Sequence, residues 1–368
     1  MRPTPFTLIQ AAATAAVLTR LARGRTRRDS LKADGSPAPQ QTISVVVPAR
    51  DEELRLAPCL AGLAGDPDVG EVLVVDDCSA DATADVARAG GARVIAGEPL
   101  PDGWCGKSWA LQQGLDQTTG DVVVFLDADA RPRPGLVREL AALLCDVDLV
   151  TAGPRFHCAG AGERLLHPSM AATIPYRTGP GDAVGWQPKA GRAIANGQCL
   201  AIRRDTLIRA GGWARVKSNI TEDVALARAL RRDGLTMAFV DACDLLEVKM
   251  YDSARETWNG WGRSLMAPDS STPRDQTEDL AVLWLTLALP LPRLLAGRGT
   301  PLDALLVAIR LAMHAALARS YRPRGIPFWL APLADVPVMV RLTWSVLRPS
   351  RSWRGRTYSR ENAHRSGT

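Results

Sequence analysis

The sequence lacks the cysteine and histidine patterns that hold a zinc ion or a disulfide framework. Its seven cysteines are an odd number without a C-x-x-C pair, and its four histidines stand at no metal-ligand spacing from them. Internal repeats and long low-complexity tracts are also absent, and 46% of the residues are hydrophobic. A disulfide-stapled module, a collagen-like chain and a wholly disordered protein are therefore excluded, and a reducing compartment fits the cysteine content.

Two common nucleotide-binding loops are missing as well. Gly106-Lys107-Ser108 resembles the end of a P-loop, but Pro101 occupies the position where that motif needs its first glycine. Gly160-Ala161-Gly162 lacks the third glycine of a dinucleotide fingerprint and follows no strand of the first strand–helix block. Any nucleotide site must therefore be built in another way.

Positive charge is concentrated at the two ends of the chain. The 368 residues carry a net charge of +6, but residues 1–28 hold six arginines and no acid, and residues 348–368 hold six arginines and one glutamate. A net charge of −5 is left for residues 29–347. Arginine clusters beside apolar stretches indicate contact with a membrane surface, and no nucleic-acid partner is expected.

The N-terminal run from Pro5 to Thr19 is apolar or small, and arginines follow it. A spanning helix needs roughly 20 apolar residues, so this run is short. No A-x-A cleavage site ends it, which argues against a secretory signal peptide. We expect residues 1–28 to be a retained membrane anchor, spanning or interfacial, with its arginines on the cytoplasmic side, and residues 29–41 to be a linker.

The composition becomes apolar again after Asp279, in segments 280–295, 302–318 and 326–347. Arg310 lies in the second of them, and a charge at the bilayer centre is costly, so we expect that segment to be interfacial or re-entrant. Residues 269–347 are predicted to be membrane-associated helices and residues 348–368 a basic tail on the cytoplasmic side. The alternative is a buried helical subdomain of a soluble protein.

Strand and helix patterns alternate over residues 42–268, the predicted catalytic domain. Near-continuous β-branched runs alternating with helices are typical of an α/β fold, with a mostly parallel sheet flanked by helices. Strands are predicted at 43–48, 71–75, 93–95, 122–126, 199–203, 237–240 and 245–248. Helices are predicted at 52–64, 80–89 with Ser79 as a cap, 107–117, 134–145, from Asp205, at 222–232 and at 253–266, with residues 153–195 irregular.

Acidic clusters follow three of these strands. Asp51, Glu52 and Glu53 come after the first, Asp76-Asp77 after the second and Asp127-Ala128-Asp129 after the third. Ligands of parallel sheets bind at the carboxyl ends of the strands, so these clusters are expected to converge. Carboxylates two residues apart can hold a hard divalent cation, whose shell substrate phosphates complete. The alternative for each cluster is an acid that caps a turn or a helix.

Together these motifs resemble a known enzyme family. ISVVVPARDEE, EVLVVDDCSADAT, GDVVVFLDADARP and Thr221-Glu222-Asp223 resemble the catalytic domain of glycosyltransferase family 2, which has the GT-A fold, over Ile43 to Pro268. GWCGKSWAL and WRGRTY resemble its membrane-bound branch that glycosylates carotenoids or accompanies hopanoid synthesis.

The resemblance implies a nucleotide-sugar site. Asp127 and Asp129 would hold Mg²⁺ or Mn²⁺ and the diphosphate, and Asp223 would be the general base. Asp51 stands where the family usually has Asn. The remaining residues implied in donor binding are Pro48, Ala49, Glu53, Asp76, Asp77 and Ala128.

The chemistry of the residues agrees with transfer. A divalent metal stabilises the nucleoside diphosphate that leaves, and a carboxylate takes the proton of the acceptor hydroxyl. One carboxylate base without a carboxylate nucleophile predicts single displacement and inversion. Two carboxylates flanking a water would instead indicate a hydrolase.

Three further positions carry both a functional and a structural interpretation, and two more carry a functional one. Lys107 begins a helix and is predicted to contact the phosphates, or is a solvated surface lysine. Trp261 and Arg263 are predicted to stack on sugar or acceptor and to neutralise the diphosphate, or are membrane-interface residues. Gln198 and Glu222 are predicted to contact sugar or acceptor.

The sequence predicts a membrane-bound inverting glycosyltransferase that uses a UDP-sugar, with glucose expected, and an apolar lipid acceptor such as a carotenoid. Its catalytic domain is expected on the cytoplasmic side of the cell membrane. Two alternatives stay open: a polyprenyl-phosphate sugar synthase, which needs a basic acceptor pocket, and a non-catalytic membrane scaffold.

Overall fold

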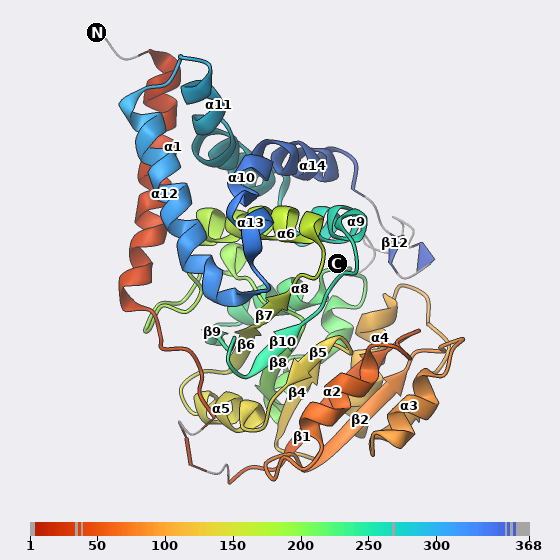
Figure 1. Cartoon of the computed structure of the whole chain (residues 1–368). Coiled ribbons are helices and arrows are strands. Elements are labelled where there is room, and N and C mark those ends of the chain that lie inside the picture. Colours follow the sequence, from red (N-terminus) through yellow and green to blue (C-terminus); the bar gives the residue numbers. More distant parts are fainter. Residues whose placement is uncertain are drawn as a thin grey trace. The chain divides into compact units, whose positions relative to one another are not determined.

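The computed structural model describes residues 4–33, 36–37, 40–266, 269–349, 352–353 and 356–357. The chain divides into two compact units (Figure 1). Unit 1 comprises Met1–Arg27, Phe156–Gly185 and Met250–Ser350, and unit 2 comprises Arg28–Arg155, Trp186–Lys249 and Arg351–Thr368. All the predicted acidic clusters belong to unit 2, and the apolar N-terminal and C-terminal segments belong to unit 1. The domain boundaries drawn from the sequence stay a prediction.

Unit 2 is built on a seven-stranded sheet with the order β3-β2-β1-β4-β8-β6-β9. Every described pairing in it is parallel except those of β8, which runs antiparallel to β4 and β6. The predicted α/β class with a mostly parallel sheet is thereby confirmed. The strands are β1 (Ile43–Ala49), β2 (Glu71–Asp76), β3 (Arg93–Ala96), β4 (Val122–Leu126), β6 (Leu149–Gly153), β8 (Cys199–Arg203) and β9 (Met237–Asp241).

Helices cover this sheet because its strands are apolar on both faces, and all five side chains of β4 are buried. The helices of unit 2 are α2 (Leu56–Leu63), α3 (Thr83–Ala89), α4 (Gly106–Gln117), α5 (Leu136–Leu143), α7 (Arg204–Arg209) and α8 (Glu222–Arg232), with short 3₁₀ turns at η2 (Ala190–Arg192) and η3 (Trp213–Val216). Trp213 packs edge-on against Phe125 of β4, with ring centroids 5.1 Å apart. A small antiparallel pair joins β5 (Ala130–Pro132) to β10 (Leu246–Val248), and another joins β12 (Ser352–Trp353) to β13 (Arg356–Thr357).

Two local predictions in unit 2 are wrong. The second helix begins at Thr83 rather than at residue 80, and Ser79 does not cap it. The Ser79 hydroxyl instead accepts a hydrogen bond from the backbone N–H of Asp51 at 3.0 Å, because the loop after β2 folds onto the loop after β1. The strand β6 was not predicted, although four of its five residues are buried.

The prediction of an irregular stretch over residues 153–195 is also wrong. It contains β7 (Arg155–His157) and the 18-residue helix α6 (Ala161–Thr178). Pro168 and Pro175 lie inside this helix, and each removes a backbone donor. The helix forms because Met170, Ala172 and Tyr176 are fully buried in the core of unit 1, and this packing outweighs local propensity.

Unit 1 is helical. Besides α6 it contains α1 (Pro5–Leu21), η1 (Ala22–Thr26), α9 (Ala254–Ser264), α10 (Pro273–Leu283), the π-helical turn η4 (Trp284–Ala288), α11 (Pro290–Leu295), α12 (Pro301–Leu317), η5 (Ala318–Ser320), α13 (Gly325–Trp329), η6 (Ala331–Ala334) and α14 (Asp335–Leu347). Its short strand β11 (Tyr321–Arg322) pairs with β7. Pro5–Thr26 and Pro301–Ser320 are long and apolar enough to cross a membrane, by length and composition alone. A hydrogen bond from Gln10 of α1 to Asp303 of α12 joins these two helices (Figure 1).

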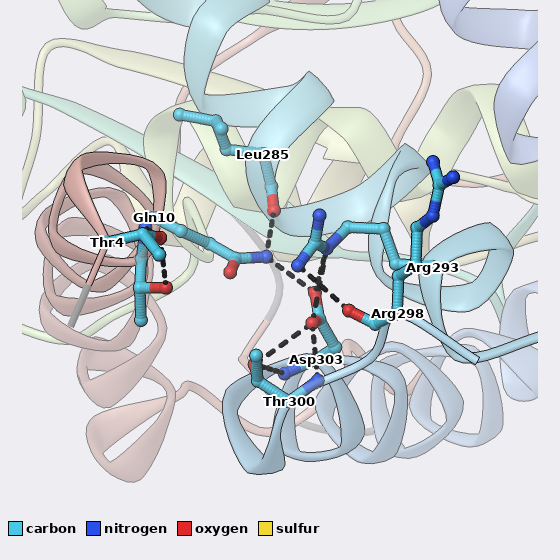
Figure 2. Close-up of polar contacts among 8 residues, drawn as sticks. Thr4, Gln10, Leu285, Arg293, Arg298, Thr300 and Asp303 are labelled. Atoms are coloured by element: carbon cyan, nitrogen blue, oxygen red, sulfur yellow. Dashed lines mark hydrogen bonds and ion pairs between the residues drawn. The ribbon is translucent and has the colours of Figure 1, made fainter. Parts of the chain in front are cut away.

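A buried polar cluster ties α1 to α12 near the first turns of both helices (Figure 2). The Asp303 carboxylate is fully buried and accepts hydrogen bonds from the Gln10 amide at 2.8 Å and from the Thr300 backbone N–H at 2.8 Å. The Arg293 guanidinium lies 3.3 Å from the same carboxylate. The N-terminal helix is thus fixed to the rest of unit 1 through specific polar contacts as well as through apolar packing.

Arg310 is paired inside unit 1. Its guanidinium donates two hydrogen bonds to the Asp335 carboxylate, at 2.7 and 2.9 Å, and the Ser169 hydroxyl donates a third at 2.6 Å. The Arg310 charge, which was the reason to expect an interfacial or re-entrant segment, is therefore neutralised by the buried Asp335 carboxylate. The position of this segment relative to a bilayer stays a prediction.

We expect Arg310→Met to destabilise the protein by about 3–5 kcal/mol, because Asp335 would be left as a buried, unpaired charge. The double variant Arg310→Met/Asp335→Leu is expected to be more stable than the single one, because it removes the charge as well. Thermal unfolding in detergent micelles measures both. Equal midpoints for wild type and Arg310→Met would show that the pair contributes nothing to stability.

Candidate active site

A lysine of unit 2 joins the end of a strand to the start of a helix. Lys107 stands in the first turn of α4, and its ammonium lies 2.7 Å from Asp127 Oδ1, directly after β4. The same nitrogen lies 2.9 Å from Glu222 Oε1, at the first residue of α8. Its interpretation as a solvated surface lysine is therefore wrong, since one cation holds carboxylates from two of the predicted acidic motifs.

Burial and mutual repulsion perturb the acids of this cluster. Burial, with the charges of Asp223 and Asp127, raises the pKa of Glu222 to about 7, although the Lys107 ammonium acts in the opposite direction. Burial acts to lower the pKa of Lys107, but the carboxylates of Asp127, Glu222 and Asp223 outweigh it, so the pKa is raised. Lys107 therefore remains a cation, and it is the counter-charge that allows these acids to share one site.

Asp223 is held in place by backbone donors. Its Oδ2 accepts from the N–H of Gly197 at 2.7 Å, and its Oδ1 accepts from the N–H of Val224 at 2.8 Å. Burial raises the pKa of Asp223, and Lys107 and these two donors act against that rise. A Cβ at Gly197 would stand 3.1 Å from Asp223 Oδ2 and 3.2 Å from Lys107 Nζ, so a side chain there would press on both groups.

Asp129 offers an oxygen that a metal could use. Its Oδ1 is buried and has no hydrogen-bond partner. Burial, followed by the charges of Asp127 and Glu52, raises the pKa of Asp129 to about 7, so a cation there would favour its ionised form. Within the described part of the chain, no group of three or more His, Cys, Asp or Glu side chains could hold a metal. The unpartnered Asp129 oxygen, with the Asp127 charge near it, fits a divalent ion bound by one or two carboxylates whose other ligands come from a diphosphate.

The loop after β1 is shaped by Asp51. Its backbone has φ 53°, in the left-handed region that Asn and Asp tolerate better than other side chains. Asp51 Oδ1 accepts from the Ala80 N–H at 2.8 Å, and Glu53 Oε2 accepts from the Ala82 N–H at 3.1 Å. The exchange of the family's Asn for Asp thus keeps the backbone shape, and both acids cap the loop after β2.

The loop after β2 carries Asp76 and Asp77. Asp76 Oδ1 accepts from the Ser79 N–H at 3.2 Å, and the Asp77 side chain is almost fully buried. Arg50 Nη1 donates to the Asp77 carbonyl at 2.8 Å and lies 3.8 Å from its carboxylate. Arg50 is not among the predicted site residues, although a single cation among the acids of PARDEE is a signal that could have found it.

The other predicted residues divide between the two units. In unit 2, Pro48 and Ala49 end β1 beside Val75 and Asp76, Ala128 is buried, and the Gln198 carbonyl accepts from the Asp127 N–H at 3.2 Å. In unit 1, the Trp261 ring stacks on His167 with ring centroids 4.0 Å apart, and burial lowers the pKa of Arg263. The predicted roles of Trp261 and Arg263 toward substrate, like all the predicted roles at this site, stay predictions.

Comparison with known proteins decides the family. The sequence profile of the family described as "Glycosyltransferase like family 2" matches residues 39–259, more than half of the chain. The chain belongs to this family. This membership confirms the predicted enzyme class, a glycosyltransferase, and counts against the alternative of a non-catalytic membrane scaffold.

Curated relatives indicate which enzymes of the family this chain is similar to. The chain is 28% identical over 254 residues to the 4,4'-diaponeurosporenoate glycosyltransferase of Staphylococcus haemolyticus (strain JCSC1435), covering 67% of this chain and 66% of that relative. It is 27% identical over 268 residues to the enzyme of the same name from Staphylococcus aureus (strain USA300), covering 70% of each. The chain thus spans about two thirds of the length of these relatives, and its predicted resemblance to carotenoid glycosyltransferases is confirmed.

A solved structure is similar to part of this chain. The glucosyl-3-phosphoglycerate synthase of Mycobacterium tuberculosis, solved with Mn²⁺, UDP and glucosyl-3-phosphoglycerate, matches with a TM-score of 0.42 and 26% identity, covering 62% of this chain and 78% of that one.

Proposed function

We propose that this protein catalyses the inverting transfer of a sugar, glucose in the first instance, from a UDP-sugar to an apolar isoprenoid lipid. The single observation that carries the proposal is the Lys107 ammonium, which binds Asp127 and Glu222 beside Asp223. A cation and several carboxylates are thereby gathered where a diphosphate and an acceptor would meet. The names of the relatives support a carotenoid-type acceptor with a hydroxyl or carboxyl group.

On the donor side, the chain binds and orients the nucleotide sugar. Asp127 and Asp129 would hold Mg²⁺ or Mn²⁺, which when bound stabilises the negative charge of the leaving diphosphate. The Lys107 ammonium can turn from its carboxylate partners toward a phosphate oxygen, because charge-assisted contacts of this kind are strong. The loops after β1 and β2, with Asp51, Glu53 and Asp76 or Asp77, would receive uracil and ribose.

On the acceptor side, Asp223 acts as the general base. The acceptor oxygen attacks the anomeric carbon, the bond from that carbon to the diphosphate oxygen breaks, and the hydroxyl proton passes to the Asp223 carboxylate. The raised pKa of Asp223 suits a group that takes up a proton in this step. One displacement inverts the configuration, and the products are the glycosylated lipid and UDP.

The membrane setting is part of the proposal. The helices α1 and α12 would anchor unit 1 in the cell membrane, and the arginines after α1 would keep the catalytic residues on the cytoplasmic side, where nucleotide sugars are found.

The test uses membranes from cells that express the protein, supplied with labelled UDP-glucose, Mn²⁺ and a total lipid extract. Label that enters the organic phase only with the expressed protein supports the proposal. A product that survives mild acid is a glycoside or ester, whereas an acid-labile product is a polyprenyl-phosphate sugar. Nucleotide binding without transfer would reject glucose or this lipid pool, and absence of both would reject the proposed activity.

We expect Asp129→Asn to raise the Mn²⁺ concentration needed for half-maximal activity by at least tenfold, because it removes one charged ligand, worth roughly 1.4 kcal/mol or more. Wild type treated with a chelator is expected to lose activity and to regain it when Mn²⁺ or Mg²⁺ is added back. The matched control is Asp146→Asn, an exposed acid of the same unit. An unchanged metal dependence in Asp129→Asn would remove that residue from the metal site.

A further inference from the structure

The segment from Gly325 to Leu347 in unit 1, which holds α13, η6 and α14, turns its polar side chains inward. It contains four of them, Asp335, Arg341, Thr343 and Ser345, and none is exposed. Asp335 binds Arg310, Arg341 Nε donates to the Trp258 carbonyl at 3.1 Å, and Thr343 accepts from the Trp284 indole at 3.0 Å. A helix at a water-facing surface has the opposite arrangement, with polar groups outside.

The outward face of this segment is apolar throughout. Apart from Gly325 and Pro337, its exposed residues are large and hydrophobic, and they recur every three or four positions, as one side of a helix does. They are Ile326, Trp329, Leu330, Leu333, Val340, Trp344 and Leu347, with exposed fractions between 46% and 76%.

Exposed apolar side chains of this size are concentrated in unit 1. Among the described residues of unit 2, the large hydrophobic ones that are exposed are Leu54 and Ile208, and all the others belong to unit 1. By contrast, helix α3 of unit 2 exposes Asp85 and Arg88, which pair at 2.7 Å. A contiguous apolar surface on a folded protein marks a contact with a partner or a membrane.

The residues at the two ends of the segment indicate what covers its apolar face. Exposed arginines stand on both sides, Arg322 and Arg324 before it and Arg348 after it. Trp329 and Trp344 are half exposed, and the Arg348 guanidinium lies 4.5 Å from the centroid of the Trp344 ring. Tryptophan and arginine flanking an apolar face match a bilayer, in which indoles lie at the headgroup level and guanidinium groups bind lipid phosphates.

We propose that Gly325–Leu347 is a lipid-binding face, which inserts its outward side chains into the surface of a bilayer and binds anionic headgroups through the flanking arginines. The helix α14 has 13 residues and is about 20 Å long, shorter than the roughly 30 Å hydrocarbon core, so it contacts the bilayer from one side. This inference deepens the membrane setting of the proposed function and rests on it for the presence of a bilayer.

The experiment places spin labels on the full-length protein in liposomes. Cysteines replace Ile326, Val340 and Leu347 one at a time, in a background in which the exposed Cys78 and Cys145 are changed to Asn and Ser. A label at Ile208, an exposed apolar position of unit 2, is the matched control. Collision rates with oxygen, which partitions into lipid, and with a water-soluble nickel chelate are measured in phosphatidylcholine with and without phosphatidylglycerol.

We expect the ratio of oxygen to nickel collisions to be several-fold higher at the three test positions than at Ile208, and higher still with phosphatidylglycerol. Replacing Arg322, Arg324 and Arg348 with Gln is expected to remove the effect of phosphatidylglycerol. Ratios equal to that at Ile208 would overturn the proposal, and so would spin–spin broadening between copies, which would make the face a contact between two chains.

The same liposomes, supplied with UDP-glucose and acceptor lipid, separate this inference from the proposed function. Lipid-exposed labels in a preparation that forms no product support the lipid-binding face and count against the transfer reaction. Water-exposed labels in an active preparation leave the reaction standing and reject the face.

Discussion

Asp223→Asn is expected to lower the rate of transfer to a hydroxyl acceptor by a factor of about 10² to 10⁴, the usual contribution of a general base. The amide is nearly isosteric and can still accept one of the hydrogen bonds that the N–H groups of Gly197 and Val224 donate. Donor binding should therefore persist while the acceptor proton has no base to receive it. The measurement is the initial rate of lipid glycosylation, together with calorimetric binding of UDP.

The control for this variant lies on the same helix. Asp233 stands at the other end of α8, where it pairs with Arg215 on the surface, so Asp233→Asn changes the same chemical group away from the cluster. Its rate should stay near that of wild type. Full activity in Asp223→Asn with a hydroxyl acceptor would assign the base to another residue.

The same variant identifies the acceptor group. A carboxylic acid is ionised at neutral pH, with an ordinary pKa of about 4, so its oxygen needs no base before it attacks. Asp223→Asn should therefore impair transfer to a hydroxyl carotenoid much more than transfer to a carotenoid acid. Equal losses with both acceptors would indicate that Asp223 orients the acceptor rather than taking its proton.

Lys107→Met is expected to produce the second large effect, a loss of about 3 kcal/mol in the free energy of unfolding. Removing one partner of a buried ion pair costs about 3–5 kcal/mol, and the lower end applies because the Lys107 and Asp127 side chains keep exposed fractions of 21% and 25%. The physical cause is repulsion among Asp127, Glu222 and Asp223 once their common cation is gone. The midpoint of thermal unfolding should fall by roughly 6–12 °C.

Second-site changes test that cause. Adding Glu222→Gln to Lys107→Met removes one repelling charge and should restore part of the lost stability. Lys189→Met, at an exposed lysine of the same unit, should change the midpoint little. If Lys107→Met unfolded at the same temperature as wild type, the ammonium would not be the counter-charge that holds the cluster together.

Local sequence patterns predicted the elements that carry the site. Two strands, Val122–Leu126 and Cys199–Arg203, and the helix Glu222–Arg232 have the bounds expected from them. They were predictable because a buried strand is an unbroken apolar run and because acids at the first turn and arginines at the last turn mark a helix.

Patterns failed where long-range packing outweighs local preference. Glycine and proline suggested an irregular stretch where α6 forms, because the burial of Met170, Ala172 and Tyr176 in unit 1 cannot be read from the neighbours of those residues in the chain. The same holds for Ser79, which looked like a helix cap and instead bonds to the loop of Asp51.

The family, the α/β class and the acids at the strand ends could be predicted from the sequence alone, because each is marked by a short local motif. Three features became evident only in the folded protein: Lys107 binds both Asp127 and Glu222, Arg310 is neutralised by Asp335, and α14 turns apolar side chains outward. These features join residues up to 115 positions apart or depend on which face of a helix is packed. The contacts between distant residues and the choice of the packed helix face are both set by how helices and strands dock, which local sequence does not encode.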